Sequence, residues 1–141
     1  MKDLSYSLAI LLSFTLVTGL YAQKPIEKTL IKSFNLQGYE VLDIYLDGDT
    51  HIEKWDSPIV RVEMAISLLS GCRKTLNMLI KSGKYDLIYD QTSHSYRISM
   101  RGLTEEFKIP GACLKDLVSY RIKVPRYVNV REGIVNSTAA K

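Results

Sequence analysis

The chain has 141 residues, of which 46% are hydrophobic and 24% are charged, and its formal net charge is +4. This length and composition suit one domain with a modest core. The basic residues are scattered from Lys24 to Lys141 and do not gather with aromatic residues, which excludes the usual pattern of a single-stranded nucleic-acid binder. We therefore expect no nucleic-acid partner.

Residues 1–22 have the layout of a secretory signal peptide. Lys2 supplies the positive start, Leu8 to Val17 is apolar, and small residues end at Ala22, directly before Gln23. The alternative is an uncleaved membrane anchor, but the apolar segment is only just long enough to span a bilayer and contains several Ser and Thr residues. We expect export to the periplasm, the cell surface or the medium, with no transmembrane span after cleavage.

The mature chain divides into three parts in this interpretation. Residues 23–33 form a polar lead-in segment that is loosely ordered, residues 34–132 form a single β-rich domain, and residues 133–141 form a flexible tail. The first strand is expected at residues 32–36, where polar and apolar residues alternate.

Three runs of β-type residues follow one another between Val41 and Ile66, separated by two short turns. Asp47-Gly48-Asp49 supplies a residue that tolerates positive φ, and Ser57-Pro58 fixes a bend. Alternation places one face of each run in a core and the other in water. The inward residues of the first and third runs are Leu42, Ile44 and Leu46, and Val60, Val62, Met64 and Ile66. The pattern predicts a sheet module that winds back on itself about every ten residues.

One short amphipathic helix is expected at about residues 73–82, where Leu76, Leu79 and Ile80 recur at helical spacing. Ser70 suits the N-cap, and Gly83 stands where a helix C-cap belongs. We interpret the apolar stripe as core packing rather than as a groove for a partner.

The β pattern resumes after this helix. Further strands are expected at Tyr85–Tyr89, Tyr96–Met100, Glu105–Ile109, Leu117–Val124 and Tyr127–Val130. In the fourth of these, Arg121 and Lys123 point outward while Tyr120, Ile122 and Val124 point inward. The fold class is therefore mainly β with one short helix, arranged either as a short-strand solenoid (right-handed β-helix-like) or as a sandwich-like sheet module.

The chain has no recognisable pattern for catalysis or metal binding. His51 and His94 have no partner at ligand spacing, and no Ser stands in a G-x-S-x-G turn. Asp43, Asp47 and Asp49 cluster around Gly48, but the spacing and closing Glu of a calcium loop are missing, so turn chemistry explains them better. We expect no catalytic residue, metal or cofactor, and we expect that the chain is not an enzyme.

Two sets of side chains are candidates for binding at the surface. The chain has nine tyrosines, and among them Tyr85 and Tyr89 are expected on one strand face, with Tyr96 across the hairpin. Half-buried strand positions explain tyrosines equally well. Arg121 and Lys123 form the second set, which would meet an anionic partner through exposed charge.

Cys72 and Cys113 are the only cysteines, and an exported protein would carry them into an oxidising compartment. A disulfide between them would close a loop of about 40 residues and contribute roughly 3–4 kcal/mol. The alternative is two small buried residues that never meet, and spacing alone does not decide between the two.

The chain resembles exported proteins of the Bacteroidetes-type DUF4097 family, which are related to the auto-transporter adhesin "head GIN" domains. The resemblance rests on the DGD and DSP turns, on the helix ending in LIKSGKYDL, and on KIPGACLKDLVSYRIKVPRYVNV, and it covers roughly Phe34 to Val130. It implies a β-rich, solenoid-like fold in the cell envelope. Family members usually continue past the Val-Pro strand into Gly- and Asn-rich rungs, which this sequence lacks.

The sequence therefore favours a non-enzymatic exported β scaffold of the cell envelope, either adhesin-like or an interaction module. The alternative is a module that binds carbohydrate or polyanion through tyrosines and outward basic residues. The expected partner is an envelope protein or an envelope polysaccharide.

Overall fold

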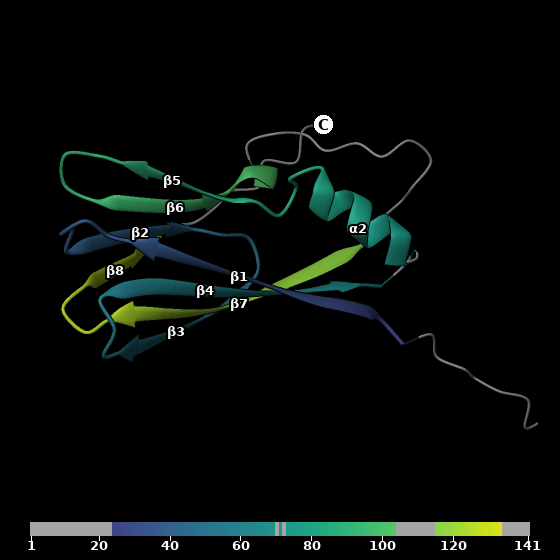
Figure 1. Ribbon diagram of the computed structural model, residues 1–141, viewed down its shortest axis with the longest axis horizontal. Helices are drawn as coiled ribbons and strands as arrows, with labels where there is room; N and C mark the ends of the chain where they lie inside the picture. The colour runs from purple at the N-terminus through teal and green to yellow at the C-terminus, as the bar shows by residue number, and fades with distance from the viewer. Residues whose placement is uncertain (1–23, 70, 72, 104–114, 134–141) are drawn as a thin grey trace, which may run out of the picture.

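The chain folds as two four-stranded β-sheets packed face to face, as the computed structural model in Figure 1 shows for residues 24–69, 71, 73–103 and 115–133. Sheet A has the strand order β1-β4-β7-β3 and sheet B has the order β5-β6-β2-β8. The elements are β1 (Ile26–Asn35), β2 (Val41–Tyr45), β3 (Asp49–Trp55), β4 (Ile59–Leu68), α2 (Arg73–Lys81), β5 (Leu87–Gln91), β6 (Tyr96–Met100), the 3-10 turn η2 (Arg101–Leu103), β7 (Asp116–Pro125) and β8 (Asn129–Glu132). The mainly β fold class is confirmed, α2 is the one α-helix among the described residues, and the sandwich-like alternative is the one observed.

The core lies between the two sheets, where alternate residues of every long strand point inward. In β4 the inward residues from Val60 to Leu68 are at most 2% exposed. Opposite them, Leu42 and Ile44 of β2 and Ile98 of β6 are at most 3% exposed. The inward assignments made from the alternation in β2, β4 and β7 are confirmed.

The pairing of the strands differs from the expected module that winds back on itself. β2 lies in sheet B, whereas β3 and β4 lie in sheet A with β7 between them. None of the three strands between Val41 and Ile66 therefore pairs with another. Among the strands that the structure describes, only β5 and β6 are sequence neighbours that pair with each other, while β2–β6, β2–β8 and β3–β7 are parallel pairs. The β2–β3 turn takes the chain from sheet B to sheet A, and the β3–β4 turn takes it past β7 within sheet A. Local sequence does not reveal either connection.

β1 begins six residues before the predicted first strand and includes most of the segment interpreted as a loosely ordered lead-in. It pairs with β4 over its whole length, from Ile26 opposite Leu68 to Asn35 opposite Ile59. The backbone hydrogen bonds with β4 order this polar segment, although its own sequence shows weak alternation.

Several other predicted boundaries shift by a few residues. β5 begins at Leu87, so Tyr85 lies before the strand, and β7 includes Pro125 as its last residue. The predicted strand at residues 105–109 and all but the first residue of the tail at 133–141 lie outside the described residues.

Helix α2 matches the predicted helix and ends as predicted at Gly83, whose φ is 84°. Gly83 N donates to Ile80 O and Lys84 N donates to Leu79 O, which is the hydrogen-bond pattern of a Schellman C-cap. Leu76 and Leu79 are buried in the core, which confirms the interpretation of the apolar stripe. The predicted N-cap, Ser70, lies outside the described residues. In the part of the chain that the structure describes, no helix is long and apolar enough to cross a membrane.

Lysines connect the two sheets at both sides of the sandwich. On one side, Lys32 Nζ of β1 donates to Leu87 O of β5 at 2.6 Å. On the other, Lys54 Nζ of β3 donates to Val128 O, just before β8. Both lysines occupy inward positions of an edge strand of sheet A, because Lys32 is paired with Val62 and Lys54 with Val124.

Gly48 allows the close approach of the β2–β3 turn to β7. Its φ is 137°, and a Cβ at this position would lie 2.2 Å from Val118 O. Gly38 also has positive φ, at 90°, but a Cβ there would meet nothing within 4 Å. The positive φ predicted for the DGD turn is thus confirmed, and a steric requirement is added to it.

Replacing Val62 by Ala should lower the free energy of unfolding by roughly 1–3 kcal/mol, because Val62 is fully buried and its methyl groups would leave a cavity. Ile31→Ala is the control, since Ile31 is 56% exposed and its truncation should change stability by less than about 0.5 kcal/mol. Urea denaturation of both variants measures the difference. Equal losses would contradict the in/out assignment of sheet A.

Replacing Gly48 by Ala should destabilise the fold more than Gly38→Ala. Both variants impose positive φ on a residue with a Cβ, which costs roughly 1–3 kcal/mol. Only the Gly48 variant also forces a Cβ against the backbone of β7. Thermal unfolding of the two variants checks the order, and a more stable Gly48 variant would show that the turn moves freely away from β7.

Candidate functional site

The outer face of sheet A carries the two basic residues that the sequence singled out. Arg121 and Lys123 point outward from β7, which lies between β4 and β3. We call the outward residues of three neighbouring rows "face A". The rows, read across β1, β4, β7 and β3, are Thr29, Ala65, Ser119 and Asp49; Ile31, Glu63, Arg121 and His51; and Ser33, Arg61, Lys123 and Glu53.

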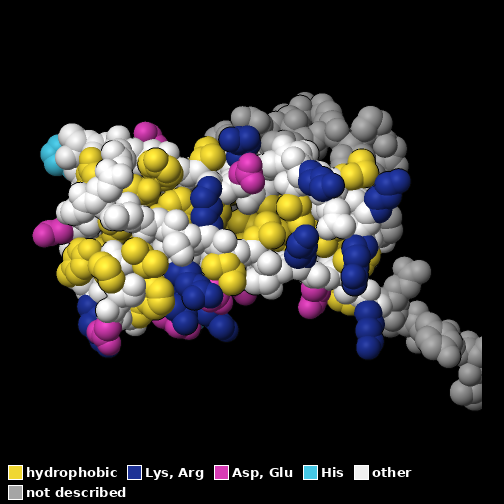
Figure 2. Space-filling view, in the orientation of Figure 1, with side chains coloured by type: hydrophobic (Ala, Val, Ile, Leu, Met, Phe, Trp, Pro, Cys, Tyr) yellow, Lys and Arg dark blue, Asp and Glu magenta, His cyan; other side chains and the backbone are white. Residues whose placement is uncertain are grey.

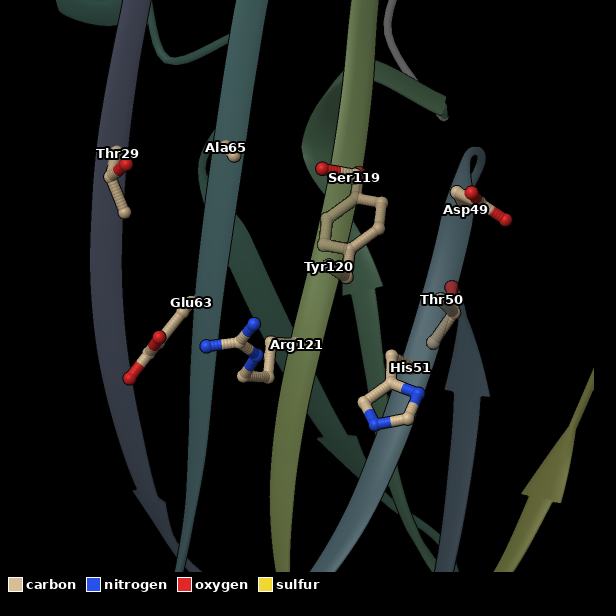
Figure 3. Close-up of a pocket in the computed structure, with 9 residues that line it drawn as sticks. All are labelled: Thr29, Asp49, Thr50, His51, Glu63, Ala65, Ser119, Tyr120 and Arg121. Atoms are coloured by element: carbon tan, nitrogen blue, oxygen red, sulfur yellow. The ribbon is translucent and has the colours of Figure 1, made fainter.

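A shallow hollow of about 490 Å³ crosses face A. Figure 3 shows small side chains along one row, from Thr29 through Ala65 to Ser119, with the longer Glu63 and Arg121 in the next row. The hollow exists because three adjacent strands place small residues in register. It is open to solvent and polar, unlike the enclosed apolar pockets that bind most small molecules.

Face A mixes charges of both signs, although Arg61 and Lys123 are both basic and are paired in register. Arg121 is paired in register with Glu63, and its Nε lies 3.8 Å from Glu53 Oε1. Arg61 Nε lies 3.2 Å from Glu63 Oε1, and Lys123 lies over the Trp55 ring at 5.8 Å from the centroid. The three rows contain three acidic residues and three Lys or Arg: Asp49, Glu53 and Glu63, and Arg61, Arg121 and Lys123. Face A therefore has no excess of positive charge.

Face A offers few groups for acid–base or metal chemistry. His51 is 73% exposed in its side chain, and its Nε2 lies 3.5 Å from Glu53 Oε1. Among the described residues, no three His, Cys, Asp or Glu side chains are grouped to hold a metal ion. The arrangement suits recognition by ion pairs and hydrogen bonds on an open surface.

The structure brings together two of the three tyrosines predicted to bind at the surface. Tyr89 of β5 stacks on Tyr96 of β6, with ring centroids 5.3 Å apart and planes 8° apart. Tyr96 is buried while Tyr89 is 56% exposed. Phe34 contacts both rings edge-on, and Tyr39 contacts Tyr96. We call these four residues the aromatic cluster, and it presents one exposed ring face.

Tyr85 does not belong to the aromatic cluster. It is 2% exposed, and its hydroxyl donates to Asp116 Oδ2 at 2.7 Å. Burial, together with the neighbouring carboxylate, raises the pKa of Tyr85. Lys84 Nζ also donates to Asp116 Oδ2 at 2.7 Å. Burial opposes ionisation of Asp116, but the hydrogen bonds from Lys84 and Tyr85 prevail and lower its pKa.

An ion pair between a buried carboxylate and an exposed arginine on the outer face of sheet B was not foreseen from the sequence. Asp43 is 6% exposed and accepts two hydrogen bonds from Arg131, at 2.7 and 3.0 Å, and one from Ser95 at 2.6 Å. Arg97 is paired with Asp43 in register and lies over the Tyr45 ring at 5.0 Å from the centroid. The hydrogen bonds from Arg131 lower the pKa of Asp43 against the opposing effect of burial. Asp43 therefore holds β8 beside β2, rather than serving the turn at Gly48.

The proposed disulfide remains a prediction, because Cys72 and Cys113 both lie outside the described residues.

No family model and no curated protein matches the chain. Among solved structures, the chain is similar to a "putative cell adhesion protein" from Clostridium sporogenes ATCC 15579, with 15% sequence identity and a TM-score of 0.39. The match covers 77% of this chain and 46% of that chain, so the chain spans less than half of its neighbour's length. These values describe a distant likeness only, and the resemblance to the DUF4097 family stays a prediction.

Replacing Arg131 by Gln should destabilise the protein at pH 7 and flatten its response to acid. The folded pKa of Asp43 lies below its ordinary value of 3.8, so its ionised form stabilises the fold above about pH 4. That stabilisation is lost as the pH falls through the folded pKa, and it depends mainly on Arg131.

Urea denaturation between pH 2 and pH 7 measures this effect. Arg126→Gln removes the same charge from an exposed pair with Asp56, and it should leave the urea midpoint unchanged. Identical pH profiles for the Arg131 and Arg126 variants would show that Asp43 does not depend on its arginine.

Proposed function

We propose that the chain is a non-enzymatic, exported β scaffold of the cell envelope that binds a protein partner through face A, as an adhesin-like or interaction module does. The observation that carries the proposal is the pattern of acidic and basic side chains on face A, which the strand register fixes in place. The charged residues stand on three neighbouring strands, β4, β7 and β3, rather than on loops. A partner therefore meets them already positioned, which lowers the entropy lost on binding.

The composition of face A favours a protein partner over a polyanion. A polyanion needs a surface with excess positive charge, whereas face A balances three acidic residues against three basic ones. A protein can present the complementary pattern, with its own acid opposite Arg121 and its own base opposite Glu63. Exposed apolar side chains stand in or next to this pattern, since Ile31 is 56% and Leu117 is 55% exposed. Mixed apolar and charged surface is typical of non-obligate protein interfaces.

The non-enzymatic part of the proposal is supported by the openness of the site. The ionisable side chains of face A pair with one another in contact with solvent, as Glu53 does with His51 and Arg121. Electrostatic catalysis gains most of its strength in sites from which water is excluded. Recognition has no such requirement.

A second candidate function is carbohydrate binding at the aromatic cluster. Tyr89 presents an exposed ring that is held flat against Tyr96, and Phe34 supports both. Lys32 Nζ lies 5.5 Å from the Phe34 ring centroid, next to this surface. A rigid aromatic face with polar groups at its rim suits the apolar face and the hydroxyl groups of a sugar ring.

A charge-swap variant distinguishes a protein partner from a polyanion. Exchanging the two charges, as Glu63→Arg with Arg121→Glu, keeps the net charge but reverses the pattern that a partner meets. The exchange also replaces the contacts of Glu63 with Arg61 and of Arg121 with Glu53 by like-charge contacts, so circular dichroism must show that the sheets are intact. Binding of the exported protein to isolated cell envelope should weaken at least about tenfold, because like charges then face each other across the interface. The measurement is co-sedimentation at two salt concentrations.

The matched control swaps another exposed pair, as Asp56→Arg with Arg126→Asp, which lies outside the rows of face A. This control should bind as the unchanged protein does. Envelope binding that survives the face A swap but falls in Arg121→Ser with Lys123→Ser would indicate a polyanion instead. Binding that falls only in Tyr89→Ala would assign the function to the aromatic cluster.

A further inference from the structure

Exposed basic side chains gather at the end of the sandwich that carries α2. Figure 2 shows Lys and Arg side chains over α2 and the neighbouring start of β1, near the point where the chain enters the described body. We call this set the "basic end". Its exposed members are Lys24 and Lys28 at β1, Arg73, Lys74 and Lys81 at α2, and Lys115 before β7.

Contacts between segments far apart in sequence bring these residues to one end. Lys28 Nζ donates to Asn77 Oδ1 of α2 at 3.4 Å, which places the start of β1 beside the helix. Leu69 N donates to Lys115 O at 3.0 Å, which joins the approach to β7 to the end of β4. The basic end is therefore a product of the fold and is not visible as a run of charges in the sequence.

Acidic residues offset this charge only in part. Glu27 is exposed on β1, between the exposed lysines 24 and 28. Asp116 is already paired with Lys84, and Asp86, next to the C-cap of α2, lies 3.8 Å from Arg101; neither Lys84 nor Arg101 is one of the six exposed cations. Among the described residues, the basic end thus keeps an excess of positive charge that face A lacks.

Exposed apolar side chains stand among these cations. Met78 is 48% exposed and lies four residues after Lys74 and three before Lys81, so the three side chains share the outer side of α2. Leu76 and Leu79 point the other way, into the core. Leu69 is 47% exposed beside Lys115. Cations mixed with exposed apolar groups are typical of surfaces that lie on a bilayer.

The chain itself indicates which partner lies at this end. The apolar segment of residues 1–22 joins the described body through Gln23 at Lys24, which belongs to the basic end. Whether that segment is a signal peptide or an anchor, the start of β1, and with it the end of the sandwich that carries α2, is the part of the described body joined most directly to it. The positive charge of the basic end is opposite in sign to the headgroups of anionic phospholipids.

We propose that the basic end binds the surface of an anionic phospholipid bilayer, with its lysines and arginines at the headgroup phosphates and with Met78 and Leu69 in the interfacial layer. Each cation should strengthen binding about fivefold at low salt. The opposite end of the sandwich, with the β3–β4 turn, would then point away from the membrane (Figure 1).

The test uses the exported protein as its host releases it, with vesicles of phosphatidylcholine alone or mixed with phosphatidylglycerol. Binding is expressed as the ratio between the two vesicle types, so that any binding through residues 1–22 cancels. Lys74→Gln with Lys81→Gln should lower this ratio by about 10- to 30-fold. The control, Arg121→Gln with Arg126→Gln, removes the same charge away from α2 and should change the ratio less than about twofold.

Three results would overturn the inference: no preference for phosphatidylglycerol, an equal loss in both double variants, or binding to a soluble anionic polysaccharide with the same affinity and variant dependence. Circular dichroism of each variant checks that α2 and the sheets are intact. Lys74→Gln with Lys81→Gln leaves face A unchanged. Loss of vesicle binding in this variant therefore tests the basic end alone, and loss of envelope binding in the charge-swap variant tests face A alone.

Discussion

The contact between the inner faces of the two sheets is the constraint on which the rest of the structure depends. In β4 every second side chain from Val60 to Leu68 is buried, and the strand lies between β1 and β7. Burial of apolar side chains is the main favourable contribution to folding, and here it requires strict alternation along β4. The same alternation points Arg61, Glu63 and Ala65 outward, so the core determines the register of face A.

The outer surfaces that result have different characters. Face A balances its charges on the outside of sheet A, and the ion pair of Asp43 and Arg131 fastens β8 to β2 on the outside of sheet B. The basic end concentrates cations where α2 meets β1. One small domain therefore presents a patterned face and a charged end that share no residues.

Local sequence predicted those parts of the structure that depend on local physics. Alternation located most strands and their inward residues, and helical spacing with Gly83 located α2 and its end. Strand pairing was not predictable, because β2 pairs in parallel with β6 and β8. Parallel neighbours are not joined by a short turn, so no turn motif in the sequence indicates the pairing. The burial of Asp43 likewise depends on Arg131, 88 residues later in the chain. Of the candidate site residues, Arg121 and Lys123 were placed outward correctly, whereas the role of Tyr85 required its distant partner Asp116.

The lysines that connect the sheets have a consequence for assembly. β1 and β3 are the edges of sheet A, and free strand edges invite pairing with other chains. Lys32 and Lys54 point inward on these edges and donate to carbonyl groups in β5 and directly before β8. A second molecule could extend sheet A by pairing its own strand with β1 or β3. Its sheet would then place another inward lysine next to Lys32 or Lys54, and burying that second charged amine costs free energy. Inward charges on edge strands are a known protection against such stacking. Sheet A is thereby disfavoured as a template for fibrous aggregation, even though its strands are long.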